Sequence, residues 1–297
     1  MGQFQINKDG ALKLKKSLDR ESQSFYNLVV QVHDMAPPPA SRYTSSAEVS
    51  IILLDVNDNP PSFISPKLTY IQENTPTDTI VFRAQATDPD SGPNCYIQYS
   101  LLSSLGNKFS IGNIDGEVHL TGELDREDVS NYTLTIIATD KGEPPLSSSV
   151  DVTVMVLDVN DNNPRFSQSI FKVEISENTL TGTDLIQVVA SDADEGLNGM
   201  VRYSIIEGNP NNEFRIDSVT GVISIAKPLD REKRSSYTLV VQSSDRGSNS
   251  RTDTATVSII LTDVNDVVPK FELSPYSVNV PENLETLPKV ILQIFIP

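Results

Sequence analysis

Several residue types are scarce in this sequence, and each shortage excludes a class of protein. The single cysteine, Cys95, cannot form an intramolecular disulfide, so a disulfide-stapled scaffold is excluded. Tryptophan is absent, which together with the cysteine count removes the Cys…Trp…Cys core of an immunoglobulin domain. The longest apolar runs, at residues 51–54 and 290–296, are too short to cross a bilayer, and the polar first ten residues show no signal-peptide pattern.

Positive charge is scarce as well. The 297 residues include 23 Lys+Arg and 40 Asp+Glu, which gives a formal net charge of −17. This charge opposes binding to a nucleic-acid backbone or to an anionic membrane, and it favours metal ions or basic partners. Hydrophobic residues, at 38%, are numerous enough to form a folded core.

Four short acidic motifs recur along the chain at a spacing of about 105 residues. They are Asp-Val-Asn-Asp (55–58, 158–161 and 263–266), Asp-Arg-Glu (19–21, 125–127 and 230–232), Glu-Asn (beginning at Glu73, Glu177 and Glu282) and Asp-x-Asp (88–90 and 192–194). Four motifs that share one period indicate an internal repeat.

This period predicts the domain organisation. We expect the C-terminal part of a repeat in residues 1–59, complete repeats in 60–162 and 163–267, and the opening of another in 268–297. The chain would then start and stop inside repeats, as a fragment does.

Within each repeat the apolar residues alternate with polar ones. Tyr132, Leu134, Ile136 and Ala138 show this pattern, and the segment from Val150 to Val156 continues it. Alternation rich in Val, Ile, Tyr and Thr predicts strands with one buried face, and the Gly/Pro-containing breaks between them predict turns. Short strands in units of about 100 residues favour tandem antiparallel β-sandwiches of the all-β class.

The Asp-Val-Asn-Asp segments close one repeat and precede the next, so they are predicted to be inter-domain linkers. Carboxylates beside a side-chain amide form a dense oxygen cluster, which suits Ca²⁺ with its six to eight hard oxygen ligands. Mg²⁺ requires a stricter octahedron, and zinc requires Cys or His; His33 and His119 have no matching partner nearby in sequence. An EF-hand is excluded because position five of the loop at residues 192–196 is Gly and its flanks are predicted strands. Paired carboxylates could also serve a glycosidase, but repetition at linkers disfavours an enzyme.

Taken together, the Glu-Asn, Asp-Arg-Glu, Asp-x-Asp, Asp-x-Gly and Asp-x-Asn-Asp-Asn motifs on such a sandwich resemble the extracellular repeat of the cadherin superfamily. The resemblance covers essentially the whole chain, and it is greatest to Fat/Dachsous-type and related protocadherins. It implies Greek-key sandwiches joined by calcium-binding linkers, with about three Ca²⁺ ions at each complete junction.

The resemblance also implies the metal ligands, residue by residue. At the junction between the complete repeats they are Glu73, Asp125, Glu127, Asp158, Asn160, Asp161, the carbonyl of Asn162, Asp192, Asp194, the carbonyl of Asn198, and Asp245. At the earlier junction they are Asp19, Glu21, Asp55, Asn57, Asp58, Asn59, Asp88, Asp90, Asn94 and Asp140. The glutamate of that junction would precede Met1, so weaker binding is expected there. At the last junction they are Glu177, Asp230, Glu232, Asp263, Asn265 and Asp266, and Val267 replaces the usual Asn.

The resemblance further implies a cell-surface, non-enzymatic protein that mediates Ca²⁺-dependent adhesion to a cadherin on a neighbouring cell, homophilic or heterophilic. The parent would be anchored in the plasma membrane by a segment outside this chain. Two alternatives are a non-adhesive spacer within an adhesion receptor and a carbohydrate-binding accessory array. Asn131-Tyr132-Thr133 matches an N-glycosylation acceptor, which suits an extracellular glycoprotein.

Overall fold

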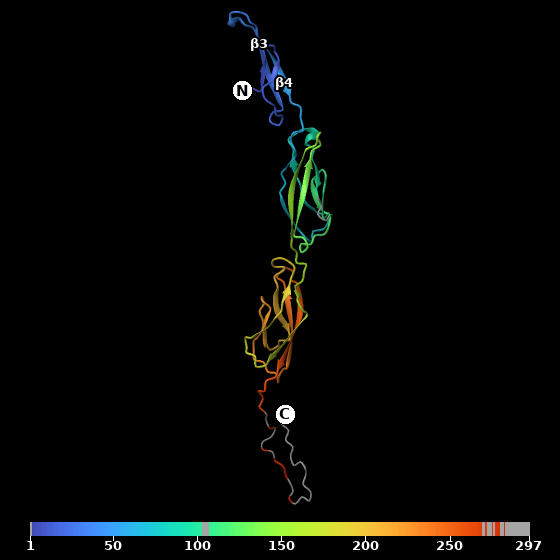
Figure 1. Ribbon diagram of the computed structural model, residues 1–297, viewed down its shortest axis with the longest axis vertical. Helices are drawn as coiled ribbons and strands as arrows, with labels where there is room; N and C mark the ends of the chain where they lie inside the picture. Colours follow the sequence, from blue (N-terminus) through green and yellow to red (C-terminus); the bar gives the residue numbers. More distant parts are fainter. Residues whose placement is uncertain are drawn as a thin grey trace. The chain divides into compact units, whose positions relative to one another are not determined.

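The computed structural model describes residues 2–102, 107–268, 271, 275, 277–279 and 282. The chain divides into two compact units, Met1–Val159 (unit 1) and Asn160–Pro297 (unit 2) (Figure 1). Most of the predicted opening of a further repeat, in residues 268–297, lies outside the described residues.

Unit 1 begins with two hairpins. Strands β1 (Phe4–Ile6) and β2 (Leu12–Leu14) form one antiparallel pair, and β3 (Phe25–His33) and β4 (Thr44–Ile52) form the other, with a short 3₁₀ turn, η1 (Pro39–Ser41), between them. The rings of Phe4 and Tyr26 pack edge to face at 5.1 Å between the hairpins, and Tyr26 is buried. We call these strands the N-terminal hairpins.

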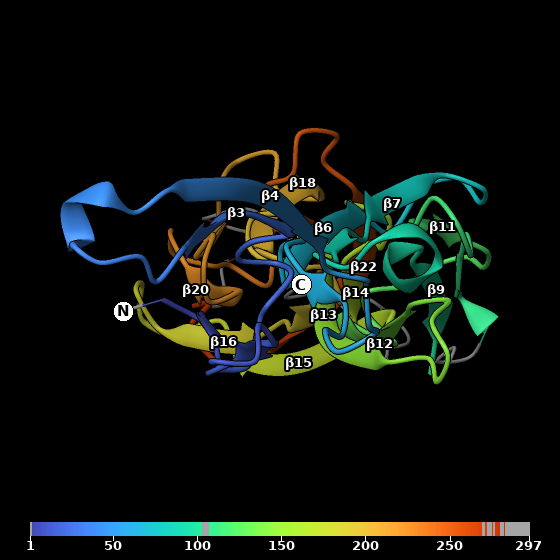
Figure 2. The ribbon, with the colours of Figure 1, turned by 90° about the horizontal axis from the view of Figure 1, so that it is seen from above.

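The rest of unit 1 is a two-layer sandwich, which we call the first sandwich. Its larger sheet has the order β6-β13-β12-β9 and its smaller sheet the order β10-β11-β7, while β5 and β8 form a separate pair. The strands are β5 (Ser62–Phe63), β6 (Leu68–Gln72), β7 (Ile80–Arg83), β8 (Ala86–Thr87), β9 (Gln98–Leu101), β10 (Phe109–Ile111), β11 (Glu117–Leu120), β12 (Asn131–Thr139) and β13 (Ser147–Leu157), with the 3₁₀ turn η2 (Gly92–Cys95) after β8. In the view of Figure 2, β12 and β13 lie on the opposite side of this sandwich from β7 and β11.

Unit 2 contains the second sandwich, which repeats this plan. Its sheets have the orders β15-β22-β21-β18 and β16-β20-β19, and β14 pairs with β17. The strands are β14 (Arg165–Phe166), β15 (Ile170–Ser176), β16 (Asp184–Gln187), β17 (Ala190–Ser191), β18 (Arg202–Glu207), β19 (Phe214–Ile216), β20 (Val222–Ile225), β21 (Ser236–Ser244) and β22 (Thr252–Thr262).

Each sandwich has its own core, built from the predicted alternation. Leu134 and Ile136 of β12 and Val152 and Val154 of β13 are fully buried, while the residues between them point outward. The same pattern recurs on β21 and β22, so the predicted all-β sandwich fold is confirmed. Phe109 and Tyr132 pack edge to face in one core, as Phe214 and Tyr237 do in the other.

One strand pairing in each sandwich is parallel. β6 pairs with β13 from Leu68↔Thr153 to Gln72↔Leu157, and β15 pairs with β22 from Ile170↔Thr256 to Ser176↔Thr262. All other pairings are antiparallel among the described residues. Because the opening and closing strands run the same way, the chain enters a sandwich at one end and leaves at the other. The acidic linkers therefore stand at sandwich ends.

Candidate metal centre

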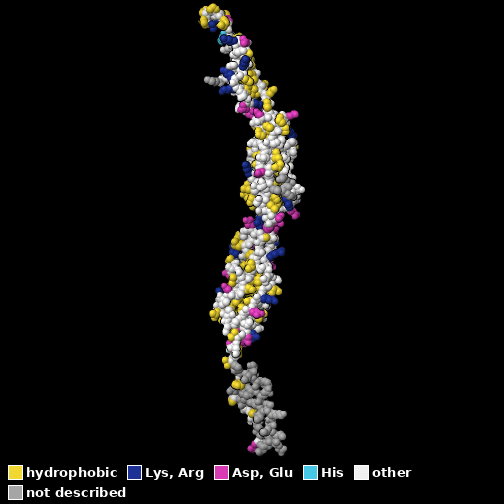
Figure 3. Space-filling view, viewed as in Figure 1, with side chains coloured by type: hydrophobic (Ala, Val, Ile, Leu, Met, Phe, Trp, Pro, Cys, Tyr) yellow, Lys and Arg dark blue, Asp and Glu magenta, His cyan; other side chains and the backbone are white. Residues whose placement is uncertain are grey.

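Acidic side chains of the first sandwich gather at its ends, and few lie on its middle in the face seen in Figure 3. At its start, carboxylate oxygens of Glu21, Asp55 and Asp90 lie within 4.8 Å of one another. We call these three residues the first cluster. Glu21 follows β2, Asp55 follows β4, and Asp90 follows β8, so three separate segments supply it.

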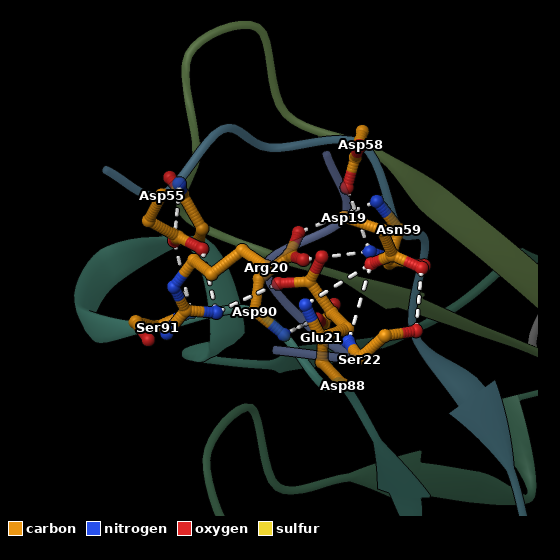
Figure 4. Close-up of polar contacts among 11 residues, drawn as sticks. Asp19, Arg20, Glu21, Ser22, Asp55, Asp58, Asn59, Asp88, Asp90 and Ser91 are labelled. Atoms are coloured by element: carbon orange, nitrogen blue, oxygen red, sulfur yellow. Dashed lines mark hydrogen bonds and ion pairs between the residues drawn. The ribbon is translucent and has the colours of Figure 1, made fainter. Parts of the chain in front are cut away.

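Arg20 lies among the acids of the first cluster. Figure 4 shows its side chain beside Asp55 and Glu21, and its Nη1 is 2.9 Å from Asp55 Oδ1 and 2.7 Å from Glu21 Oε1. One guanidinium offsets part of the charge of three carboxylates, so this end of the first sandwich stays strongly negative.

The linker after β4 is held by loops of the first sandwich. The backbone N–H of Ser91 and the amide of Asn94 both donate to Asp55 Oδ2, each at 2.9 Å. Asn57 donates from Nδ2 to Asp140 Oδ1 at 3.1 Å and to the carbonyl of Pro144 at 2.7 Å. The linker therefore has side-chain contacts with two separate loops.

Two further residues complete this arrangement. Asn59 donates to Asp90 from its backbone N–H at 3.3 Å and from Nδ2 at 2.8 Å, and Nδ2 also reaches Asp58 Oδ1 at 2.7 Å. Asp19 accepts a hydrogen bond from the hydroxyl of Ser22 at 2.7 Å, which lowers the pKa of this exposed carboxyl together with backbone N–H donors. The ten residues predicted for this junction thus belong to one connected region.

Buried oxygen atoms in this region fit a hard cation. Asn57 Oδ1 and Asp88 Oδ2 are buried and have no hydrogen-bond partner among the described residues. Burial raises the pKa of Asp88, and the negative charges of the nearby Asp90, Asp140 and Asp55 raise it further. A hydrogen bond from the backbone N–H of Asp90 acts in the opposite direction but does not cancel the rise. A buried acceptor without a donor is costly, as is a crowded carboxylate. Both costs fall when an oxygen-binding cation is present, so the donor set suits Ca²⁺.

A second cluster lies at the other end of the first sandwich. Carboxylate oxygens of Glu73, Asp125 and Glu127 are within 4.8 Å of one another. Glu73 is 5% exposed and accepts backbone hydrogen bonds from Arg126 at 2.8 Å and Val159 at 2.7 Å. Arg126 Nε is 2.6 Å from Asp158 Oδ1. This ion pair corresponds to the pair of Arg20 and Asp55 in the first cluster.

The remaining ligands predicted for the second junction gather at the start of unit 2. Asn160 Nδ2 donates to Asp245 Oδ2 at 3.1 Å, and Asn162 Nδ2 donates to Asp194 Oδ1 and Asp161 Oδ1, each at 2.8 Å. Asn198 belongs to the loop after Asp194, where its N–H donates to the carbonyl of Glu195. These contacts repeat those of Asn57, Asp140, Asn59 and Asp90.

The buried oxygen atoms repeat as well. Asn160 Oδ1 and Asp192 Oδ2 have no hydrogen-bond partner within the described part of the chain. Burial raises the pKa of Asp192, and the charges of Asp194 and Asp245 add to this rise. The same two positions in two repeats thus hold buried acceptors without a hydrogen-bond partner, and such oxygen atoms suit a hard cation.

The third cluster consists of Glu177, Glu232 and Asp266, whose carboxylate oxygens lie within 4.8 Å of one another. Glu177 accepts hydrogen bonds from the backbone N–H of Arg231 at 2.6 Å and of Val264 at 3.0 Å, and these bonds lower its pKa. Asp230 is 2.8 Å from Lys233 Nζ. Asp263, at 3.1 Å from Arg231 Nη1, and Asn265 are exposed.

Two contributions were missed from the sequence. The arginine of each Asp-Arg-Glu motif pairs with the first aspartate of the linker, and its threefold recurrence was a signal that could have suggested a role. Gly142 and Gly247 leave room for the linker asparagine: a Cβ would lie 2.2 Å from Asn57 Nδ2 and 2.3 Å from Asn160 Nδ2, respectively. The recurring Asp-x-Gly pattern at residues 140–142 and 245–247 marks both glycines, but the space itself depends on how the loop folds against the linker.

Tandem β-sandwiches joined by acidic linkers are typical of one class of protein, the cadherins, and a comparison with known families supports this assignment. A model of the cadherin domain matches residues 1–52, 67–157 and 171–262. The chain belongs to the cadherin family. Members of this family are not enzymes, and this chain, as a cadherin, is not one either.

The relatives narrow the class to Fat-type protocadherins. The chain is 74% identical over 294 residues to human protocadherin Fat 4 and 71% identical to the mouse protein. Each alignment covers 99% of this chain but 6% of the relative. Protocadherin Fat 1 of human is 40% identical over 94% of this chain. The chain therefore spans a small part of the length of the curated relatives it matches.

Solved structures agree on the fold. The extracellular cadherin domains 3–6 of protocadherin gamma B2 superpose with a TM-score of 0.77 at 28% identity, covering 88% of this chain and 66% of that one. A mouse cadherin-23 fragment of domains 22–24 gives a TM-score of 0.70 at 31% identity, covering 89% and 83%. Among the described residues, no helix has the length and hydrophobicity needed to cross a membrane.

Proposed function

We infer that this chain is the Ca²⁺-dependent part of a cell–cell adhesion receptor, built from cadherin repeats at residues 60–162 and 163–267 and partial repeats at 1–59 and 268–297. The observation that carries this inference is the repetition of buried, unpartnered oxygen atoms at equivalent positions, Asn57 and Asp88 in unit 1 and Asn160 and Asp192 in unit 2. These four positions lie at the acidic linkers and the loops beside them, and a bound cation would satisfy their oxygen atoms.

The ligands are those predicted from the sequence, with about three ions at a complete junction. When bound, Ca²⁺ supplies positive charge that compensates carboxylates from both sides of a linker. The chain's own residues prepare this: Glu73 and Glu177 are fixed by backbone N–H donors, and Asn57 and Asn160 are fixed against the loops that follow. Calcium would thus hold successive repeats in one arrangement and stiffen the array.

The partner would be another cadherin on an apposed cell, in a homophilic or heterophilic contact, with no nucleic acid and no small-molecule substrate. The parent protein would be a glycoprotein anchored in the plasma membrane with these repeats outside the cell. A non-adhesive spacer within an adhesion receptor is the second candidate. Aggregation of beads coated with this chain separates the two, since a spacer would not aggregate them.

Calcium titration tests the proposal directly. We expect saturable binding by isothermal calorimetry, weakened in Asp161→Ala, whereas Asp151→Ala, on the outer face of β13, should leave it unchanged. In solution scattering, the maximum dimension should be larger and better defined in Ca²⁺ than in chelator. Absence of calcium binding, or equal scattering curves in both conditions, would contradict the proposal.

A further inference from the structure

The outer face of the larger sheet of the first sandwich carries an apolar surface that its core does not use. Leu68 and Tyr70 of β6 are 45% and 58% exposed, Leu157 of β13 is 44% exposed, and Met155 lies between them, half-buried. The register places Tyr70 beside Met155 and Leu68 beside Thr153. We call Leu68, Tyr70, Met155 and Leu157 the Tyr70 patch.

The N-glycosylation acceptor borders this patch. Asn131 is the first residue of β12, and both Asn131 and Thr133 are exposed on the outer face, whereas Tyr132 between them is buried. Asn131 is the direct cross-strand neighbour of Met155. Its Nδ2 lies 3.4 Å from the Ser130 hydroxyl, a long hydrogen bond that leaves the amide accessible.

The second sandwich differs at these positions in a consistent way. Ser236 occupies the place of Asn131, as the first residue of β21 and the cross-strand neighbour of Ile260. Ile260 replaces Met155, but Lys172 and Glu174 of β15 replace Leu68 and Tyr70, and Thr262 replaces Leu157. The sandwich without an acceptor thus has charged residues in place of Leu68 and Tyr70, although Ile170 and Ile260 remain exposed on that face.

We propose that Asn131 carries an N-linked glycan that covers the Tyr70 patch. The modification would take an oligosaccharide from a lipid pyrophosphate donor. A bond forms between Asn131 Nδ2 and the anomeric carbon of the first sugar, the bond from that carbon to the pyrophosphate oxygen breaks, and the lipid pyrophosphate leaves with the amide proton. This proposal rests on the extracellular location given under the proposed function.

Sheet geometry brings the patch within reach. Tyr70 is two strands away from Asn131, about 10 Å at the usual strand spacing, with Met155 between them. Pyranose rings have a face of C–H bonds, which can pack on an aromatic ring and on aliphatic side chains. Glycans on surface asparagines are bulky and solubilising, so the cover would protect an exposed apolar area that otherwise promotes association.

Occupancy is the first test. The whole chain is secreted from mammalian cells behind a cleavable leader, and its mass is compared before and after an amidase that removes N-glycans. We expect a glycan that is lost in Asn131→Gln and Thr133→Ala but retained in Thr133→Ser. A secreted chain that binds calcium but has an unmodified Asn131 overturns the inference and leaves the proposed function standing. A chain that is glycosylated at Asn131 but binds no calcium overturns the proposed function and leaves the glycan inference standing.

Cover of the patch is the second test. Hydroxyl-radical labelling of Tyr70 should rise severalfold when the glycan is removed, while Tyr96, which is equally exposed at 57% and lies outside the sheet, should not change. In Leu68→Lys/Tyr70→Glu, which copies the second sandwich, removing the glycan should no longer increase binding of a hydrophobic dye. Equal labelling of Tyr70 with and without the glycan would contradict the proposal that the glycan covers the Tyr70 patch.

Discussion

The first and third clusters share their residue types but differ in their surroundings. In the first, the side chain of Asp55 is 17% exposed and that of its partner Arg20 is 21% exposed. In the third, the equivalent Asp263 and Arg231 are 62% and 39% exposed. The described residues after the first linker include the Asp90 loop, whereas those after the third include no such loop. At the first linker, the sandwich that follows supplies hydrogen-bond partners that hold the linker: Ser91, Asn94 and Asp140.

The largest effect is expected when the hydrogen bonds between the first linker and the sandwich that follows it are removed. Asp90→Ala deletes a 6% exposed carboxylate that accepts two hydrogen bonds from Asn59 and belongs to the first cluster. Calcium affinity at that junction should fall by at least the roughly 10–100-fold that loss of a supporting contact costs a metal site. Calorimetric titration measures the loss. Asp266→Ala, in the third cluster, is the control and should not change this step.

A smaller effect is expected from filling the space beside the linker. In Gly142→Ala, the new Cβ would lie 2.2 Å from Asn57 Nδ2, and Asn57 is held by Asp140 and Pro144. Overpacking of this kind costs about 1–3 kcal/mol. Urea unfolding measures it, and Gly2→Ala is the control because the nearest atom to its new Cβ would lie 3.7 Å away, at ordinary contact distance. An equal loss in both variants would contradict a fixed Asn57.

The third cluster provides a test by pH. Backbone N–H donors lower the pKa of Glu177 below its ordinary value of 4.5, so the ionised carboxylate stabilises the fold. This stability is present above pH 4.5 and is lost as the pH falls through the lowered pKa. Glu177→Gln should therefore lower the melting temperature in chelator at neutral pH, and its curve should approach that of the parent chain in acid. Glu174→Gln, on the exposed face of β15, should follow the parent at every pH.

The smallest effect is expected at the exposed arginine. Exposed ion pairs contribute roughly 0–1 kcal/mol, so Arg231→Gln should change the unfolding free energy by no more than this. Arg20→Gln should have the larger effect, because Arg20 lies among the acids of the more enclosed first cluster. Equal effects, measured by denaturant unfolding in chelator, would mean that the following sandwich does not strengthen the pairing.

Much of the fold could be predicted because burial in a sheet imposes a period of two. The alternation from Tyr132 to Ala138 and from Val150 to Val156 identified β12 and β13, and the recurrence of motifs placed the acids at sandwich ends. The parallel pairing of β6 with β13 could not be predicted, since register between distant segments leaves no local pattern.

The same limit applies to the site. The acids of the first and third clusters were expected together, and the structure brings them together. The space at Gly142 and the unpartnered oxygen of Asn57 arise from the meeting of a loop with a linker 85 residues away in sequence. Such features depend on tertiary contacts alone. Roles of the individual residues as calcium ligands remain predictions.

The parallel pairing of opening and closing strands has a mechanical consequence. A force that pulls on the two linkers of a sandwich acts along β6 and β13 in opposite directions, so it shears all their hydrogen bonds together and cannot open them one at a time. β6 and β13 share five paired positions, while β15 and β22 share seven. Under tension along the chain, the first sandwich should therefore yield before the second.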